Sequence, residues 1–191
     1  MTLRNLLPGA LWLGFALGSG TAFLRHGSLL SLTMAVVNLL IAVLFIMRRL
    51  EAPADGPAIP SGNLGASLLA WTGTFLPFLL RPDGAITPLP MAFQIVGVLG
   101  IVFSLTALGR SFGLSPARRG VVTHGLYGWV RHPLYAAELI YFFGVVLAAP
   151  TLSNGLVWAA LILIQLRRAL NEERCLSADA AYRDYLGAVR Y

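Results

Sequence analysis

The residues best suited to chemistry lie in the segment 123–138, where a polar loop with two glycines leads into an apolar run. Arg131 and His132 precede Pro133, and proline suits the first position of a helix because its missing N–H would have no partner there. The free N–H groups of that turn, the helix dipole and two basic side chains would then converge. The segment predicts an anion-binding site, to which Tyr135 offers a ring or a hydroxyl. Interfacial anchoring of the same side chains in a membrane is the alternative.

Acidic side chains are the candidate partners of this site. Glu172 and Glu173 follow the last apolar run and could accept hydrogen bonds from a cationic or hydroxyl-rich ligand. The alternative is a solvated acidic pair balanced by arginines, such as Arg168 at i,i+4 spacing from Glu172. Glu138 lies five residues after Pro133, about 7.5 Å along a helix. A charged carboxyl at the centre of a membrane helix costs about 2.5–3.5 kcal/mol, so Glu138 must face protein or water, carry a proton, or snorkel to the interface.

Composition indicates a membrane protein. The chain has 191 residues, of which 57% are apolar and 12% charged, with a mean hydropathy of +0.75. All fourteen basic residues are arginines, grouped between apolar runs, which is typical of membrane topology and not of a nucleic-acid interface. One cysteine excludes an intrachain disulfide and a cysteine cluster, and three scattered histidines predict no metal site.

Six apolar segments predict an all-α, polytopic integral membrane helix bundle. A helix needs about 17–25 residues to cross the bilayer core, and the first four segments meet this length. The fifth is short unless it begins inside the Arg-His-Pro turn, and the sixth needs flanking residues at both ends. Five spans, with one segment re-entrant or flat, is the alternative. The segments are residues 6–24, 29–47, 64–80, 91–108, 134–149 and 156–166.

Arginine placement favours six spans with both termini in the cytoplasm. In that topology twelve of the fourteen arginines are cytoplasmic, and only Arg25 and Arg81 lie outside. Arg4 precedes a long apolar run without a convincing cleavage site, which predicts a retained first span. The lack of lysine suggests a GC-rich bacterial genome and hence a bacterial inner membrane. Beyond Gln165, mixed charges predict a C-terminal cytoplasmic helical extension, interrupted near residues 177–180.

Several short motifs between residues 108 and 191 occur together. An Arg-His-Pro-x-Tyr sequence is followed, near the end of the chain, by two adjacent glutamates, and this ordered pair is the specific signal. With these motifs, the segment resembles the isoprenylcysteine carboxyl methyltransferase and phospholipid methyltransferase group of integral membrane enzymes. The residues that carry the resemblance are Gly125-Leu126-Tyr127, Val130-Arg131-His132-Pro133-Leu134-Tyr135, Asn171-Glu172-Glu173, Tyr182-Arg183-Asp184-Tyr185 and Val189-Arg190.

The resemblance implies S-adenosylmethionine as methyl donor, bound at the cytoplasmic face by residues 110–191 of a single membrane domain. Residues 1–109 would be the scaffold through which the acceptor gains access. The donor's carboxylate suits basic groups and the helix start, whereas its amino group and ribose hydroxyls suit the glutamates. An apolar slot would hold adenine, and the tail helix would close the site. The donor-binding residues expected are Leu126, Tyr127, Val130, Arg131, His132, Pro133, Tyr135, Glu172, Glu173, Tyr185 and Arg190.

Methyl transfer requires alignment and exclusion of water, and orientation can supply about 7–11 kcal/mol of the barrier. A carboxylate or thiolate acceptor needs no base, whereas a phenol or amine can need one, for which Glu138 or His132 are candidates. The catalytic residues expected are Arg131, His132 and Glu138. The expected acceptor is a hydrophobic or lipid-tailed molecule, with a small isoprenoid or lipid favoured, and membrane lipids are the other partner. The alternative is a non-catalytic membrane accessory protein or small transporter that does not bind the donor.

Overall fold

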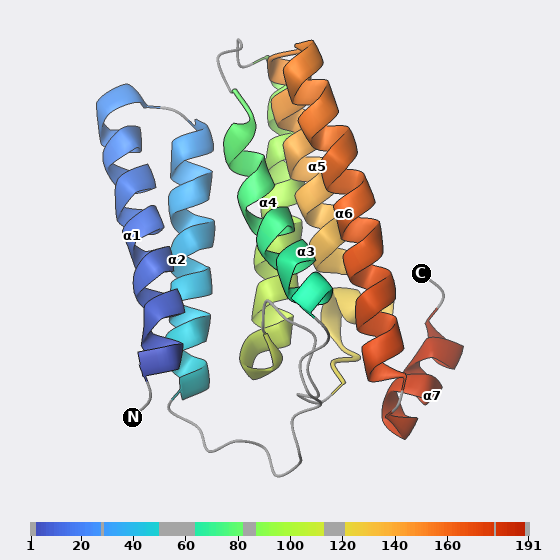
Figure 1. Cartoon of the computed structure of the whole chain (residues 1–191). Coiled ribbons are helices and arrows are strands. Elements are labelled where there is room, and N and C mark those ends of the chain that lie inside the picture. The colour runs from blue at the N-terminus through green and yellow to red at the C-terminus, as the bar shows by residue number, and fades with distance from the viewer. Residues whose placement is uncertain are drawn as a thin grey trace. The chain divides into compact units, whose positions relative to one another are not determined.

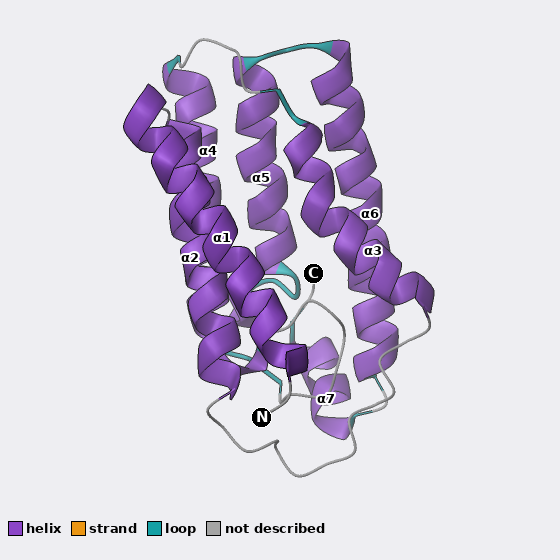
Figure 2. Ribbon diagram, turned by 60° about the vertical axis from the view of Figure 1, so that its left-hand side comes forward, coloured by secondary structure: helices purple, strands orange, loops and turns teal. Residues whose placement is uncertain are grey.

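The computed structural model describes residues 3–27, 29–49, 64–81, 87–112, 121–177 and 179–189. These residues form helices and short connections, without a strand among them (Figures 1 and 2). The all-helical fold agrees with the prediction from sequence. The α-helices are α1 (Leu3–His26), α2 (Leu29–Arg49), α3 (Leu64–Phe75), α4 (Pro88–Leu108), α5 (Pro133–Ala148), α6 (Leu152–Leu176) and α7 (Ala180–Ala188), and the 3-10 helices are η1 (Leu76–Leu79), η2 (Gly109–Ser111) and η3 (Gly125–Gly128).

Two of the described helices are long and apolar enough to cross a membrane. They are Leu7–Arg25 within α1 and Pro88–Leu108, which is α4. Shorter apolar stretches lie at Ser31–Ile46, Leu68–Leu79 and Pro133–Ala148. Six spans therefore stay a prediction.

The described helices fall into two compact units. The first contains α1, α2 and η2, with α1 and α2 antiparallel (Figure 1). A Cβ on Gly9 would lie 3.6 Å from Cγ1 of Ile46, so the two helices touch at ordinary van der Waals distance there. Phe45 and Phe112 add an edge-to-face aromatic pair with ring centroids 5.6 Å apart, a favoured geometry for two rings.

In the second unit, glycines bring α4 and α5 into close contact. A Cβ on Gly97 would lie 2.5 Å from the backbone nitrogen of Tyr141, and one on Gly100 would lie 2.8 Å from Cβ of Ala137. Gly144 of α5 has a comparable role, because its Cβ would lie 2.8 Å from Cγ of Gln94. Small residues allow backbones to approach in this way. The two helices are therefore closely packed along this face of α4.

The third apolar segment is α-helical only as far as Phe75. Its α-helix ends at Phe75 and continues as η1, because the ring of Pro77 clashes with the carbonyl one turn earlier and its nitrogen has no proton. Gly73 lies against α6, where an added Cβ would be 3.0 Å from both Cγ2 of Ile164 and Nη1 of Arg168. This glycine leaves room for the Arg168 side chain.

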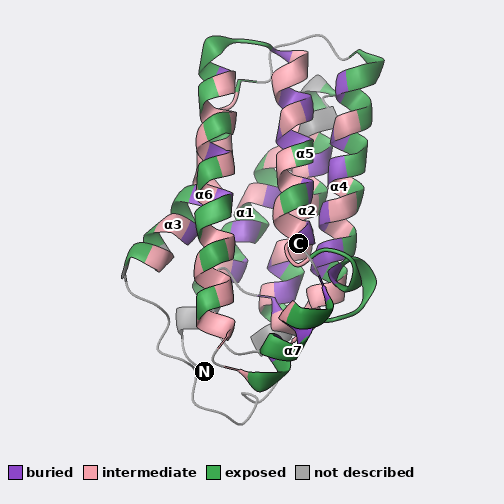
Figure 3. Ribbon diagram, turned by 90° about the vertical axis from the view of Figure 1, so that its right-hand side faces the viewer, coloured by how far each residue is buried: buried purple, intermediate pink, exposed green. Residues whose placement is uncertain are grey.

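A tight turn joins α5 and α6 into an antiparallel hairpin (Figure 1). Oγ1 of Thr151 accepts a hydrogen bond from the Asn154 N–H at 3.1 Å and so caps α6. The fully buried Asn154 amide donates to the carbonyls of Ala149 at 2.8 Å and Arg81 at 2.9 Å. Most of α6 is half-buried or exposed (Figure 3). Its buried residues, Asn154, Leu161 and Gln165, are seven and four positions apart and so share one face. The helix break expected near residues 177–180 is found between Leu176 and Ala180.

Candidate functional site

The loop before α5 is shaped by a turn of 3-10 helix. Gly125 begins this turn with φ +63°, a left-handed conformation that glycine adopts without steric cost. The N–H groups of Trp129 and Val130 both donate to the carbonyl of Leu126, at 3.1 and 3.0 Å. Pro133 then opens α5, and no side chain caps the helix start. The predicted helix start is confirmed, and it leaves N–H groups of the first turn for other partners.

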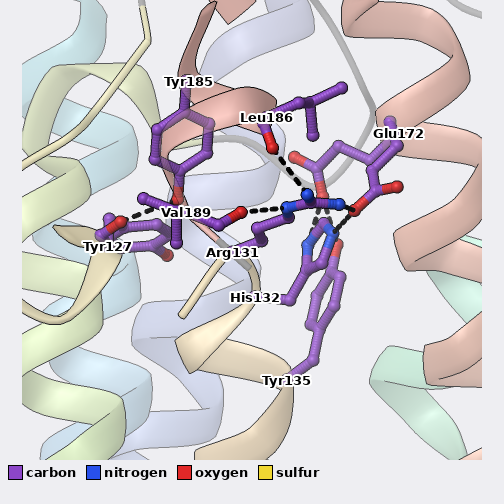
Figure 4. Close-up of polar contacts among 9 residues, drawn as sticks. Tyr127, Arg131, His132, Tyr135, Glu172, Tyr185, Leu186 and Val189 are labelled. Atoms are coloured by element: carbon purple, nitrogen blue, oxygen red, sulfur yellow. Dashed lines mark hydrogen bonds and ion pairs between the residues drawn. The ribbon is translucent and has the colours of Figure 1, made fainter. Parts of the chain in front are cut away.

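Two side chains at the start of α5 meet two side chains on α6 (Figure 4). Nε2 of His132 lies 3.1 Å from Oε1 of Glu173, and its Nδ1 lies 3.9 Å from Oε2 of Glu172. The hydroxyl of Tyr135 donates to the same Glu172 oxygen at 3.0 Å. Tyr135 follows His132 by three positions, so both lie on one face of the chain, and their rings stack with centroids 5.6 Å apart. The structure therefore brings together the helix start and the acidic pair.

Arg131 contacts both the end of α7 and the acidic pair of α6. Its Nε donates to the carbonyl of Val189 and its Nη2 to the carbonyl of Leu186, both at 2.7 Å. Its Nη1 lies 3.5 Å from Oε1 of Glu173. The carbonyls at the C-terminal end of a helix lack partners within that helix, and Arg131 satisfies two of them at the end of α7 (Figure 4).

The α7 helix is also held by an apolar cluster and by the hydroxyl of Tyr185. Tyr182, Tyr185 and Val189 are buried together, and the Tyr185 hydroxyl donates to the backbone carbonyl of Tyr127 at 2.8 Å. Burial is the main cause that raises the pKa of the Tyr127, Tyr182 and Tyr185 phenols. Their hydroxyls therefore stay protonated and able to donate.

The residues expected to form an adenine slot lie in different environments. Tyr127 is buried, with 8% of its surface exposed, whereas Leu126 and Val130 are each 37% exposed. Tyr135 is half-buried. An apolar surface that includes Leu126 and Val130 is thus present beside the turn, next to Trp129, which is 82% exposed.

A polar chain leads from this cluster into the α5–α6 interface. The Gln165 amide donates to Oε2 of Glu138, and Oε1 of Gln165 accepts from Nη1 of Arg168 at 3.0 Å. The Arg168 guanidinium lies over the Tyr135 ring, 4.7 Å from its centroid, a distance typical of a cation–π contact. Glu138 consequently faces protein, one of the possibilities left open by the sequence.

Gln165 was not identified as a site residue from the sequence. Its polar amide at the end of an apolar run was a signal that it has a polar partner. The spacing of Arg168 from Glu172 suggests an ion pair, whereas in the structure Arg168 contacts Gln165 and Tyr135. Arg190 lies outside the described residues.

The assembled groups can accept hydrogen bonds through two carboxylates and donate them through the helix start. This combination suits a ligand that carries both charge signs.

Comparison with known proteins gives one result. A family model described as phospholipid methyltransferase matches residues 85–181, about half of the chain. No curated protein and no solved structure matches. The matched residues include α4, α5 and α6, and with them His132, Tyr135 and both glutamates.

Proposed function

Because the chain belongs to the phospholipid methyltransferase family, we propose that it uses S-adenosylmethionine to methylate a hydrophobic or lipid-tailed acceptor at the cytoplasmic membrane face. One observation carries this proposal: His132 meets Glu173, and Tyr135 meets Glu172, where α5 begins. A non-catalytic accessory protein or small transporter gives no reason for these four side chains to meet within a methyltransferase domain.

The chemistry of these groups fits the donor. The glutamates are acceptors for its amino group and ribose hydroxyls, and charge-assisted hydrogen bonds of this kind are about twice as strong as neutral ones. The uncapped helix start, with the N–H groups of Leu134 and Tyr135, suits its carboxylate. The exposed apolar surface of Leu126 and Val130 suits adenine.

The protein's residues would orient the donor and the acceptor and would accept one proton from an acceptor that carries it. When bound, the donor supplies a methyl group on a positively charged sulfur, which keeps the electron pair of the broken carbon–sulfur bond. We assign His132 to orientation of the acidic pair, since both of its ring nitrogens face carboxylates. We assign Glu138 as the base for an acceptor that is a phenol or an amine, because Gln165 fixes its carboxylate.

A membrane location is consistent with an acceptor that has an apolar tail and with a site at the cytoplasmic face. The family is membrane-associated, and an acceptor with an apolar tail can remain in lipid while its polar atom reaches the donor. Six spans with cytoplasmic termini, in a bacterial inner membrane, would place Arg131 before α5 and the arginine-rich end of α6 in the cytosol, where a polar donor is available. A small isoprenoid or lipid-like acceptor is favoured.

Isothermal titration of the purified full chain with S-adenosylmethionine tests the donor assignment. We expect saturable binding of the donor and of its demethylated product, because both carry the amino group, carboxylate and ribose hydroxyls to which the site is matched. Absence of binding by both compounds would refute the proposal and favour the accessory or transport function. A transfer assay with radiolabelled methyl groups over lipid extracts would then identify the acceptor class.

A further inference from the structure

The guanidinium of Arg131 joins three parts of the second unit: the loop before α5, the end of α7 and the acidic pair of α6. We propose that Arg131 is a positioning residue that holds α7 closed over the Arg-His-Pro turn, and that it is not a ligand of the donor's carboxylate. The first part of this proposal stands without the proposed function, whereas the second part rests on it.

The geometry at the end of α7 uses the shape of the arginine side chain. Nε and Nη2 point to the carbonyls of Val189 and Leu186, each at 2.7 Å. A planar fork with several fixed donors makes two such bonds at once, and a lysine ammonium does not reproduce this arrangement. A cation at a helix C-terminus is also favoured by the helix dipole. Arg131 is therefore matched to these carbonyls in both shape and charge.

The α7 helix depends on contacts of this kind. It has nine residues, and isolated helices shorter than about 12–15 residues are marginal in water. Its other anchors are the Tyr185 hydrogen bond to Tyr127 and the apolar cluster of Tyr182, Tyr185 and Val189. Loss of the Arg131 bonds would release the C-terminal carbonyls and loosen the helix.

The same arginine links closure of α7 to the site. Oε1 of Glu173 lies 3.5 Å from Nη1 of Arg131 and 3.1 Å from Nε2 of His132. The Arg131 guanidinium thus both holds α7 in its docked position and contacts the carboxylate of Glu173. If the donor binds only when α7 is docked, the apparent donor affinity falls in proportion to the docked fraction.

A direct role for Arg131 makes the opposite prediction. If the donor's carboxylate took the Nε and Nη2 donors, the carbonyls of Leu186 and Val189 would lose their partner and α7 would loosen as the donor bound. A positioning role predicts that the donor leaves α7 docked or makes it tighter. The two roles therefore predict opposite effects of the donor on the docking of α7.

Thiol labelling in the full chain measures docking directly. Val189→Cys in a Cys175→Ser background places a reporter at a position that is 8% exposed while α7 is docked. We expect Arg131→Gln to speed maleimide labelling of this thiol about tenfold or more, and Arg131→Lys to fall between. Arg174→Gln, a matched loss of charge at an exposed arginine of α6, should leave the rate unchanged. S-adenosylmethionine should slow labelling in the Arg131 chain.

Two results would overturn the proposal: unchanged labelling in Arg131→Gln, or faster labelling when the donor is added to the Arg131 chain. Hydrogen exchange of the α7 amides in the chain with native Val189 gives the same answer if the cysteine reporter perturbs folding. If Arg131→Gln does not fold, Tyr185→Phe is the second variant. It removes the hydrogen bond to the Tyr127 carbonyl and should also speed hydrogen exchange of the α7 amides. Failure of the unsubstituted chain to bind the donor would refute the proposed function but not the effect of Arg131 on labelling.

Discussion

His132 and Glu173 are forty-one residues apart in the chain, and Nε2 of one lies 3.1 Å from Oε1 of the other. The α5–α6 hairpin produces this contact, because the start of one antiparallel helix lies beside the late turns of the next (Figure 1). The Thr151 cap and the buried Asn154 amide fix the hairpin turn at the opposite end. The position of the site is therefore set by helix length and by a turn well away from it.

Gly97→Ala should destabilise the protein by about 1–3 kcal/mol, the usual cost of an overpacked site. The new methyl group would lie 2.5–2.6 Å from backbone and Cβ atoms of Tyr141, so α4 and α5 would have to separate. Thermal unfolding in detergent measures the change. Gly155→Ala is the matched control, because nothing lies within 4 Å of its Cβ position. Equal midpoints for the two variants would contradict the close packing.

Glu138→Gln should separate donor binding from methyl transfer. The amide preserves the size of the side chain and can still pair with Gln165, so donor affinity should stay within about twofold. Transfer to a phenolic or amine acceptor should fall by roughly 10²–10⁴-fold, the usual contribution of a general base. Single-turnover transfer of a radiolabelled methyl group measures this step. Unchanged transfer to such an acceptor would remove Glu138 from the mechanism.

The sequence was sufficient for the helix start at Pro133, for the break near residues 177–180 and for the association of the turn with the acidic pair. These features depend on local rules and on a recognisable motif. The bonds from Arg131 to α7 were not predictable, because backbone carbonyls have no sequence signature. The Glu138–Gln165 contact also required the register of α5 against α6. Pro77, by contrast, was a visible signal for the early end of α3.

Stability should be lost at alkaline pH through the buried tyrosines. Burial raises the pKa of Tyr127, Tyr182 and Tyr185 above their unfolded value of about 10. Above that value the folded state binds more protons than the unfolded state, so the free energy of unfolding decreases as pH rises. Apart from the other three of the six tyrosines, few groups titrate there, since the chain has no lysine.

A series of thermal midpoints from pH 7 to 11 tests this expectation. We expect no tyrosine-dependent change below about pH 9 and a fall above about pH 10. The Tyr185→Phe variant should start from a lower midpoint and decline less steeply. If the thermal midpoint of the unsubstituted chain instead begins to fall near neutral pH, and does so in Tyr185→Phe as well, groups other than these tyrosines cause the loss of stability.

Single cysteines in a Cys175→Ser background test the proposed topology. With six spans and cytoplasmic termini, a cysteine at Ala188 should react with a membrane-impermeant maleimide only after the cells are opened. A cysteine at Pro150, in the exposed turn between α5 and α6, should react in intact cells. Labelling of both positions from the same side would rule out a hairpin of two membrane spans.

The central claim is that the start of α5 and the acidic pair of α6 form one binding site for the methyl donor. A double-mutant cycle with His132→Ala and Glu173→Ala, read out by titration with S-adenosylmethionine, tests it most directly. We predict that each substitution weakens binding about tenfold or more without unfolding the protein, and that the double variant loses clearly less than the two single losses combined. Unchanged affinity in both single variants, with the fold intact, would contradict the claim.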